Sequence, residues 1–294
     1  MNPFPGPFLP RSSVRALLGP VWRHGRFWAR SPEYRAWLRF NRRLRQVPRF
    51  KPGQVSYRRL PIRYADAASF LSAWHEIFVC GLYEINGPGD SRLPLLVDAG
   101  ANIGLAPLYW KTRFPAFRYL GFEPDPLVAQ ICRANLEAWG CGGTLHELAL
   151  AGTAGRRRFL RDYADGGAFN HRASTAETFE VPAVKLSEFI TEPVDLLKID
   201  IEGAEDEVLP EIEARLGWVR NLFVEIHSRK NEPQSWGGLI ACLQRAGFRC
   251  YTRPLRAPWR PFVETAENAL GFDDQFNIFA VRPTDASSPK VSCE

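Results

Sequence analysis

Three observations in the sequence predict an α/β fold built on a doubly wound, mostly parallel sheet. From about residue 93 onward, short apolar runs that end in polar residues alternate with helical stretches, the pattern of parallel strands joined by crossover helices. One apolar run leads directly into a glycine loop and then a helix. The chain has 294 residues and is 45% hydrophobic, enough for one large core with an attached segment.

The first sixty residues differ from the rest in charge. They carry fourteen Lys and Arg and a single acid, Glu33, for a net charge of +13, while the remaining chain carries −7. Apolar residues between 14 and 22 recur with the period of one helix face, which predicts a first helix. Ser31 followed by Pro32 is typical of a helix start and predicts a second helix, which has aromatic residues on one side and arginines elsewhere.

We assign residues 1–62 to this basic, aromatic-rich helical extension, and its role stays open. Residues 11–59 are suited to contact an anionic membrane or a phosphate-bearing carrier, or to pack on the catalytic domain with a solvated basic face. They contain no known nucleic-acid-reading motif, so no nucleic-acid partner is expected. A linker rich in Pro, Arg and Gly is predicted to end at about Arg63.

A helix with an apolar, aromatic face is predicted from residue 66 to about residue 81. Glu76 and Tyr83 lie in and just after this segment, ahead of the glycine loop. We expect them to line a lid over the active site, or else to serve in packing and at the surface.

The alternating strands and helices define a domain that we expect to span residues 63–285. The predicted strands comprise residues 93–98, 118–123, 145–150, 194–200 and 221–227. The predicted helices comprise residues 105–113, 126–138 and 204–216, followed by a last helix (236–246) and two short runs (249–252 and 277–281). Residues 156–184 break the alternation and are interpreted as a β-rich insertion or loop over one end of the sheet. Residues 286–294 are expected to form a flexible tail.

The segment LLVDAGANIG, residues 95–104, has the order of strand, glycine loop and helix that a cofactor site requires. Gly100 is expected to let the backbone come close to a ligand, and Gly104 to let the following helix pack tightly on the strand. The N-terminus of that helix favours a negative group such as a carboxylate. Glu123 ends the next strand, twenty-five positions after Asp98, where a carboxylate can accept hydrogen bonds from two ribose hydroxyls.

Asp98 bears on which cofactor the loop binds. Dinucleotide-binding domains carry G-x-G-x-x-G, which admits a pyrophosphate, whereas the spacing here is G-x-x-x-G with an acid in front. A carboxylate at that place repels a pyrophosphate and suits a ligand with an ammonium and a sulfonium. The loop therefore favours S-adenosylmethionine. Nucleotide-dependent redox chemistry and a turn without a ligand stay open as alternatives.

Four segments, VDAGANIG, FEPDP, LLKIDIEGAE and FVEIH, together resemble the FkbM family of methyltransferases. The likeness covers about residues 66–282, and KIDIEGAE is its most specific part. It implies the Rossmann-like class I methyltransferase fold, with seven strands of which the last is antiparallel. It also implies methyl transfer from S-adenosylmethionine to an oxygen, often a hydroxyl of a sugar, glycolipid or secondary metabolite. Together, the loop and the resemblance mark as cofactor-binding Asp98, Gly100, Asn102, Gly104, Glu123 and Asp200.

Candidate catalytic residues lie in the second half of the likeness. Lys198 and Asp200 end the fourth predicted strand, Glu202 lies in the turn beyond it, and His227 ends the next strand. Ligands bind at the carboxyl ends of such strands, so these side chains are expected beside the sulfonium. His227 is the first choice as general base, because an unperturbed pKa of about 6.5 leaves it mostly neutral at about pH 7. Asp200 is the second choice.

Other roles for the same residues remain open. Lys198 suits a structural ion pair, Glu202 suits an acid at a helix N-terminus, and His227 suits a strand cap. Alternatively, Asp200, Glu202 and His227 are the ligands of a divalent cation, since two carboxylates and an imidazole bind several metals.

Two functions from different classes therefore remain. The first is an O-methyltransferase that acts on a small-molecule or glycan acceptor. The second is a non-catalytic, carrier-binding module that keeps the cofactor fold and docks through the basic N-terminal hairpin. No run approaches the ~18 apolar residues that span a bilayer, and the start lacks the layout of a signal peptide. A cytoplasmic protein is expected, with peripheral contact to the inner face of the membrane left open.

Overall fold

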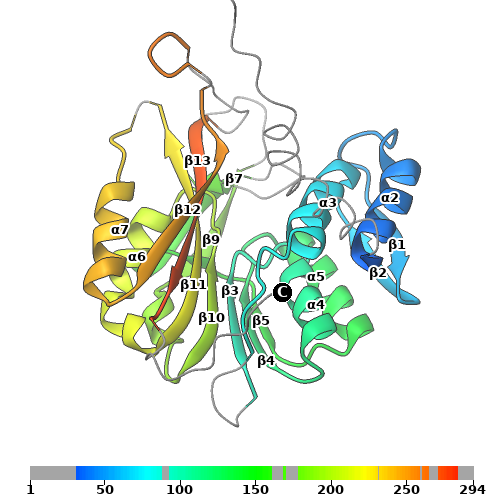
Figure 1. Cartoon of the computed structure of the whole chain (residues 1–294), viewed down its shortest axis with the longest axis horizontal. Helices are drawn as coiled ribbons and strands as arrows, with labels where there is room; N and C mark the ends of the chain where they lie inside the picture. The colour runs from blue at the N-terminus through cyan, green and yellow to red at the C-terminus, as the bar shows by residue number, and fades with distance from the viewer. Residues whose placement is uncertain are drawn as a thin grey trace, which may run out of the picture.

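The computed structural model describes residues 31–87, 93–160, 168–169, 178–230, 232–258, 260–264 and 271–283. Its centre is a seven-stranded sheet with the strand order β12-β13-β11-β10-β3-β4-β5 (Figure 1). The strands are β3 (Leu95–Ala99), β4 (Arg118–Phe122), β5 (Thr144–His146), β10 (Val194–Ile199), β11 (Val219–Arg229), β12 (Arg249–Arg256) and β13 (Phe272–Val281). Neighbours from β5 to β11 pair in parallel, and β13 lies antiparallel between β11 and β12. The predicted mostly parallel sheet with an antiparallel last strand is confirmed.

Helices cover both faces of this sheet, which makes it doubly wound (Figure 1). The helices on one face include α4 (Leu105–Arg113) and α5 (Pro126–Trp139), and those on the other include α6 (Glu205–Glu211) and α7 (Trp236–Arg245). Alternate strand residues divide between two cores: Leu96 packs with the first group of helices and Val97 with the second. Every residue of β3 and β10 is buried, as expected for strands between two helical layers.

The described part of the N-terminal region packs into the first of these cores. α2 (Pro32–Leu44) begins at the predicted cap, where the Ser31 side chain accepts a hydrogen bond from the Tyr34 amide. Phe40 on its inner face meets Trp74 of α3 (Ala67–Trp74) edge-on, with ring centroids 5.1 Å apart. The first predicted helix and the predicted tail lie outside the described residues.

The prediction of a linker before Arg63 is wrong. This region contains a β-hairpin made of β1 (Gly53–Tyr57) and β2 (Leu60–Tyr64), and alternate residues on it are buried. The boundary expected between residues 62 and 63 therefore falls inside a strand. The hairpin and α2 share one core with α3 and α5.

One buried amide connects this hairpin to the glycine loop. The Asn135 side chain, on α5, accepts a hydrogen bond from the Arg63 amide (2.8 Å) and donates to the carbonyls of Arg63 (2.9 Å) and Ile103 (2.8 Å). Asn135 is only 1% exposed, so water cannot replace these hydrogen bonds. The backbone of β2 and the loop after β3 are thereby held by the same side chain.

A second sheet, with the order β6-β9-β7-β8, occupies the region of the predicted insertion. Its strands are β6 (Ala149–Leu150), β7 (Gly155–Leu160), β8 (Ala168–Phe169) and β9 (Thr178–Val184). The described part of residues 156–184 is β-rich, as predicted. The strand predicted at residues 145–150 is divided, because β5 ends at His146 and β6 joins the second sheet. Among the described residues, no helix has the length and apolar character needed to cross a bilayer.

Candidate functional site

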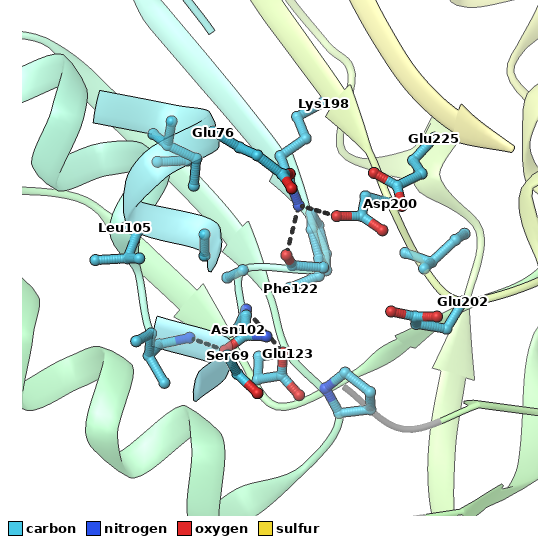
Figure 2. A pocket seen from close by; sticks show the side chains of 18 of the residues that line it. Ser69, Glu76, Asn102, Leu105, Phe122, Glu123, Lys198, Asp200, Glu202 and Glu225 are labelled. Carbon is cyan, nitrogen blue, oxygen red and sulfur yellow. Dashed lines mark hydrogen bonds and ion pairs between the residues drawn. The ribbon is translucent and has the colours of Figure 1, made fainter. Parts of the chain in front are cut away.

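A cavity of about 360 Å³ opens at the carboxyl ends of β3, β4, β10 and β11 (Figure 2). This volume lies in the range of small-molecule sites, about 300–1,000 Å³, and this edge of an open α/β sheet is where ligands bind. One wall comes from α3 and the π-helical turn η1 (His75–Val79), and another from Leu150 and Phe159 of the second sheet. The polar lining includes Ser69, Glu76, Tyr83, Asn102, Glu123, Lys198, Asp200, Glu202, Glu225, Arg256 and Gln275.

The two loop glycines are required by packing between elements. Gly100 has a φ of +90°, and a Cβ on it would lie 1.9 Å from the carbonyl oxygen of Asp200, just after β10. A neighbouring strand end therefore excludes a side chain there, where the sequence predicted the approach of a ligand. Gly104 has a φ of +83°, and a Cβ on it would lie 2.9 Å from Cys132 Sγ on α5. It allows the start of α4 to approach α5 closely, and it does not line the cavity.

Glu123 stands at the carboxyl end of β4, as predicted, and lines the cavity. Its two carboxylate oxygens accept hydrogen bonds from the backbone N–H groups of Asn102 (2.9 Å) and Asp125 (3.0 Å). Burial raises the pKa of Glu123 to about 7, although these two hydrogen bonds favour the charged form. Asn102 has a φ of +48°, and its Oδ1 accepts a hydrogen bond from the Ile103 amide.

Asp98 lies beneath the cavity rather than in its lining. It is fully buried, with its Oδ1 3.2 Å from Lys198 Nζ, and its Oδ2 accepts a hydrogen bond from the Tyr119 hydroxyl (3.2 Å). Lys198 Nζ also donates to the Gly100 carbonyl (2.6 Å) and lies 3.6 Å from Asp200 Oδ2. Burial opposes the charge on Lys198, but Asp98 and Asp200 outweigh it and raise the pKa of this ammonium. Lys198 therefore joins the two strand ends by ion pairs.

One end of the cavity is rich in carboxylates. Asp200, Glu202, Glu225 and Glu76 all line it, and Figure 2 shows Asp200 and Glu225 close to Lys198. Burial raises the pKa of Glu76, and the charges of Glu225 and Asp200 raise it further. Glu202 has a φ of +56°, an unusual backbone conformation that is often found at functional sites.

Tyr83 forms part of the cavity wall. It is 4% exposed, its ring packs edge-on against Phe223, and its backbone carbonyl accepts a hydrogen bond from Trp110 Nε1 (3.0 Å). Burial, followed by the charge of Asp200, raises the pKa of its hydroxyl. Glu76 and Tyr83 therefore both contact the cavity, and their role as a lid stays a prediction.

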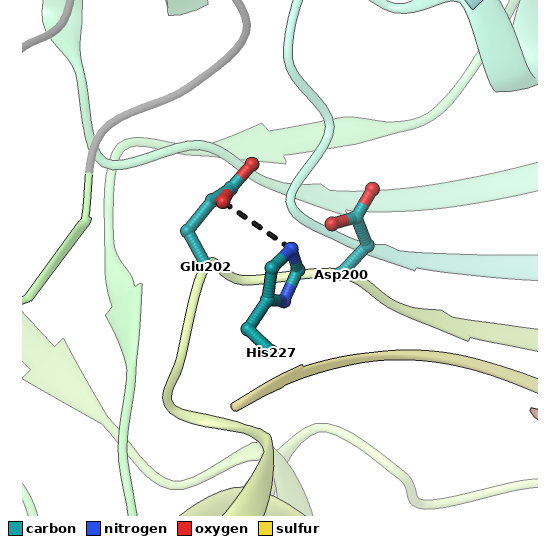
Figure 3. A group of neighbouring side chains, drawn as sticks. All are labelled: Asp200, Glu202 and His227. Atoms are coloured by element: carbon teal, nitrogen blue, oxygen red, sulfur yellow. Dashed lines mark ion pairs between the residues drawn. The ribbon is translucent and has the colours of Figure 1, made fainter. Parts of the chain in front are cut away.

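His227 lies behind this acidic end and does not line the cavity. Its side chain is 0% exposed, and its Nε2 lies 3.3 Å from Glu202 Oε2 (Figure 3). The same atom lies 3.5 Å from Glu225 Oε1. Burial disfavours a charged ring, but the surrounding carboxylates, Glu202 first, outweigh it and raise the pKa of His227 well above its usual range. An imidazolium cannot accept a proton. The environment therefore opposes the choice of His227 as general base.

Glu205 fixes the position of the His227 ring, a role that the sequence did not reveal. Its Oε1 lies 3.1 Å from His227 Nδ1, and its carboxylate accepts hydrogen bonds from the amides of Ile201 (3.0 Å) and Gly203 (3.1 Å). Glu205 is 2% exposed. Glu205 belongs to the KIDIEGAE segment, which was the only feature of the sequence that pointed to it. An acid in the first turn of a helix is common, so its position alone does not predict a contact with His227.

The predicted residues thus fall into three groups. Asn102 and Glu123 lie toward one end of the cavity, and Asp200 and Glu202 lie toward the other (Figure 2). Asp98, Gly104 and His227 support these residues from outside the lining. The lining residues that were not among the predicted site residues include Ser69, Glu225, Arg256 and Gln275.

Comparisons with known proteins agree with this architecture. The profile of the "Methyltransferase FkbM domain" matches residues 98–250. Methyltransferase sdnD of Sordaria araneosa is 31% identical over 252 residues, which cover 72% of this chain and 89% of that protein. The 31-O-demethyl-FK506 methyltransferase FkbM of Streptomyces tacrolimicus is 28% identical, with 63% of this chain and 83% of that protein covered.

Among solved structures, fibrillarin of Aeropyrum pernix in complex with S-adenosyl-L-methionine is similar over 80% of this chain and 85% of its own, at 15% identity and a TM-score of 0.41. The family profile spans more than half of the chain and includes Gly100, Glu123 and three acids of the cavity, Asp200, Glu202 and Glu225. This protein belongs to the FkbM family of methyltransferases.

Proposed function

We propose that this protein transfers a methyl group from S-adenosylmethionine to a hydroxyl oxygen of a small-molecule or glycan acceptor. The observation that supports this most directly is the placement of Glu123 and the acidic cluster in one cavity, at opposite ends. Both oxygens of Glu123 are anchored by backbone N–H groups, so its carboxylate is fixed in space. A fixed carboxylate at the end of the second strand is suited to accept hydrogen bonds from ribose hydroxyls.

The acidic end suits the positive groups of the same cofactor. Asp200, Glu202 and Glu225 place carboxyl groups in a partly buried region, where attraction between a carboxylate and a sulfonium or an ammonium is stronger than in water. The N-terminus of α4 next to the glycine loop favours the cofactor's carboxylate. The residues present therefore fit a ligand that carries two hydroxyls, two cationic centres and one carboxylate.

Methyl transfer to a hydroxyl requires alignment and the removal of one proton. A bond forms between the acceptor oxygen and the methyl carbon while the carbon–sulfur bond breaks, leaving S-adenosylhomocysteine, and the hydroxyl proton passes to a base. Positioning in the cavity is the largest contribution, with effective molarities on the order of 10⁵ M or more. The base must line the cavity, which Asp200, Glu202 and Glu225 do and His227 does not. A positioned base contributes about a 10²–10⁴-fold gain in rate.

The choice of oxygen as the methylated atom is supported by a relative. The Streptomyces tacrolimicus protein is named for a 31-O-demethyl substrate, so its own acceptor atom is an oxygen. Two tests separate cofactor use from acceptor choice. Calorimetric titration with S-adenosylmethionine is expected to show saturable binding, and absence of binding would refute the proposal. A screen with methyl-labelled cofactor against glycans, lipid-linked sugars and polyketide alcohols is expected to label an oxygen.

A second candidate is a carrier- or membrane-binding module without turnover. It is favoured by the arginines on the outer side of α2, where Arg35, Arg39, Arg42 and Arg43 are exposed while the opposite face is buried. The labelled-cofactor screen separates the two candidates, because any turnover excludes a purely binding role. Sedimentation with phosphatidylserine vesicles tests the membrane contact, which is expected to weaken as salt is added.

A further inference from the structure

Three side chains at the acidic end form a constellation that has the composition of a metal site. One donor atom each from Asp200, Glu202 and His227 lies within 4.8 Å of the other two (Figure 3). Donor atoms on opposite sides of one ion, each bound at about 2.1 Å, are about 4.2 Å apart. The three groups therefore reach a single ion with small shifts of their side chains.

The His227 ring is oriented as a metal-ligating imidazole would be. Its Nδ1 faces Glu205 Oε1 at 3.1 Å, and Glu205 is itself held by two backbone N–H groups, so its carboxylate accepts the proton of Nδ1. The Nδ1 proton is thereby fixed, and Nε2, which faces Glu202, is the nitrogen that can bind an ion once its own proton leaves. A carboxylate that fixes the distal nitrogen of a ligating histidine is a recurrent arrangement in metal sites.

An independent observation is the state of His227 Nε2. The atom is fully buried, and no described residue gives it a hydrogen bond of acceptable geometry. Its nearest polar neighbours are carboxylate oxygens of Glu202 at 3.3 Å and Glu225 at 3.5 Å. Buried polar atoms are rarely left without a hydrogen-bond partner. A cation among these atoms would satisfy all of them.

The negative charges around these three side chains also favour a bound cation. Asp200, Glu202 and Glu225 lie together at this end of the cavity, and the ammonium of Lys198 is shared with Asp98 below it. Like charges in a partly buried region are costly unless cations compensate them. A divalent ion compensates two of these negative charges.

We propose that Asp200, Glu202 and His227 bind one divalent metal ion that holds and polarises the acceptor hydroxyl, a role that rests on the proposed function. Two carboxylates and one imidazole favour a first-row ion such as Mn²⁺ over Mg²⁺, because the imidazole nitrogen suits transition metals. Three protein ligands leave positions for the acceptor oxygen, whose proton is released more easily beside a cation. Glu225, which lines the cavity next to these ligands, takes that proton.

Titration of the chelator-treated full-length protein with Mn²⁺ tests the site, with the EPR signal of free Mn²⁺ as the readout. We expect one bound ion per chain and nitrogen modulation from His227 in the pulsed EPR spectrum. Glu202→Gln is expected to weaken Mn²⁺ binding by at least about tenfold, since even outer partners of a site contribute about that much. Circular dichroism checks the fold of the variant, and Asp200→Asn is the second variant if Glu202→Gln does not fold.

Glu76→Gln is the matched control, because it removes a carboxylate from the same cavity without removing a proposed ligand. It is expected to change Mn²⁺ affinity by less than about threefold. Equal losses in Glu76→Gln and Glu202→Gln, or no Mn²⁺ bound at about 1 mM, would overturn the site. Titration of the metal-free protein with S-adenosylmethionine keeps the two proposals apart. Cofactor binding without Mn²⁺ binding overturns the metal site alone. Mn²⁺ binding without cofactor binding overturns the proposed function and the metal's role in it, but not the metal site.

Discussion

Gly100 lies directly against the main chain of Asp200, with no room for a Cβ between the glycine and the aspartate carbonyl. The Asp200 amide in turn donates a hydrogen bond to the carbonyl of Ala99 (3.0 Å). The loop after β3 and the loop after β10 are therefore in direct backbone contact. Two segments a hundred residues apart in the chain therefore fix each other's position. This contact also fixes the distance between the glycine loop and the acidic cluster.

Gly100→Ala is expected to lower the free energy of unfolding by about 2 kcal/mol or more, because it adds left-handed backbone strain and a clash with Asp200. Urea denaturation followed by circular dichroism measures the loss. Gly142→Ala is the matched control, since a Cβ there meets nothing within 4 Å, and a change within about 0.5 kcal/mol is expected. Equal stability of the two variants would show that the contact tolerates a side chain.

Lys198→Met is expected to lower the free energy of unfolding by about 3–5 kcal/mol, because it leaves the buried carboxylate of Asp98 without its ion-pair partner. The double variant Asp98→Asn with Lys198→Met is expected to recover most of that loss. Arg118→Met breaks the more exposed pair with Glu192 and is expected to cost less than about 1 kcal/mol. Similar denaturation midpoints for Lys198→Met and Arg118→Met would contradict the role of the buried pair.

Glu123→Ala is expected to weaken S-adenosylmethionine binding by at least about tenfold, because a hydrogen bond to a charged group contributes about 1.5–3 kcal/mol. Calorimetry gives the dissociation constant, and circular dichroism checks that the fold is intact. Glu147→Ala removes an exposed carboxylate just beyond β5 that does not line the cavity, and it should leave the constant unchanged. An unchanged constant in Glu123→Ala would refute the ribose contact.

Cofactor binding is expected to depend on pH through Glu123, whose pKa burial raises to about 7. Ribose hydroxyls donate to the ionised carboxylate, so the bound cofactor lowers this pKa and binding releases a proton. Affinity should therefore fall as the pH drops below about 7, approaching a tenfold loss per pH unit. Calorimetry in buffers of different ionisation enthalpy measures the released proton. Glu123→Gln should release none, and release of the same proton by that variant would assign it to another group.

Phe40→Ala is expected to lower the free energy of unfolding by about 3–5 kcal/mol, because Phe40 is 5% exposed and packs on Trp74. The neighbouring Leu38→Ala is the control, since Leu38 is 46% exposed, and it should cost less than about 1 kcal/mol. A small effect of Phe40→Ala on thermal denaturation would mean that α2 is a separable appendage.

The sequence was most informative where both faces of a strand are buried. β3 and β10 lie between two helical layers, so their residues form recognisable apolar runs, and the glycine loop marks the order of elements. The hairpin of β1 and β2 was missed because Pro61 and a pair of arginines in its turn conceal the alternation of buried residues. The π-helical turn of η1 was also missed, since no periodicity in the sequence marks one wide turn.

The site was predictable in position but not in the direction of its side chains. Asp200, Glu202 and His227 were expected together, because neighbouring parallel strands end at one edge of the sheet, and they are together. Asp98 and His227 were expected to face the ligand, and both instead lie outside the cavity lining. Their orientation depends on long-range partners, Lys198 for the first and Glu205 for the second, which strand order alone does not reveal.

The hydrogen bonds of Asn135 have a practical consequence for protein engineering. Because this amide binds the backbone of both β2 and the glycine loop, a chimera between relatives must take α5 from a parent with asparagine at position 135. The hairpin and α5 also share one core of side chains, so both are best taken from the same parent. A crossover placed at residue 62 would cut β2 and pair half of it with a foreign strand. The first workable fusion point in the described chain therefore precedes α2 rather than following the hairpin.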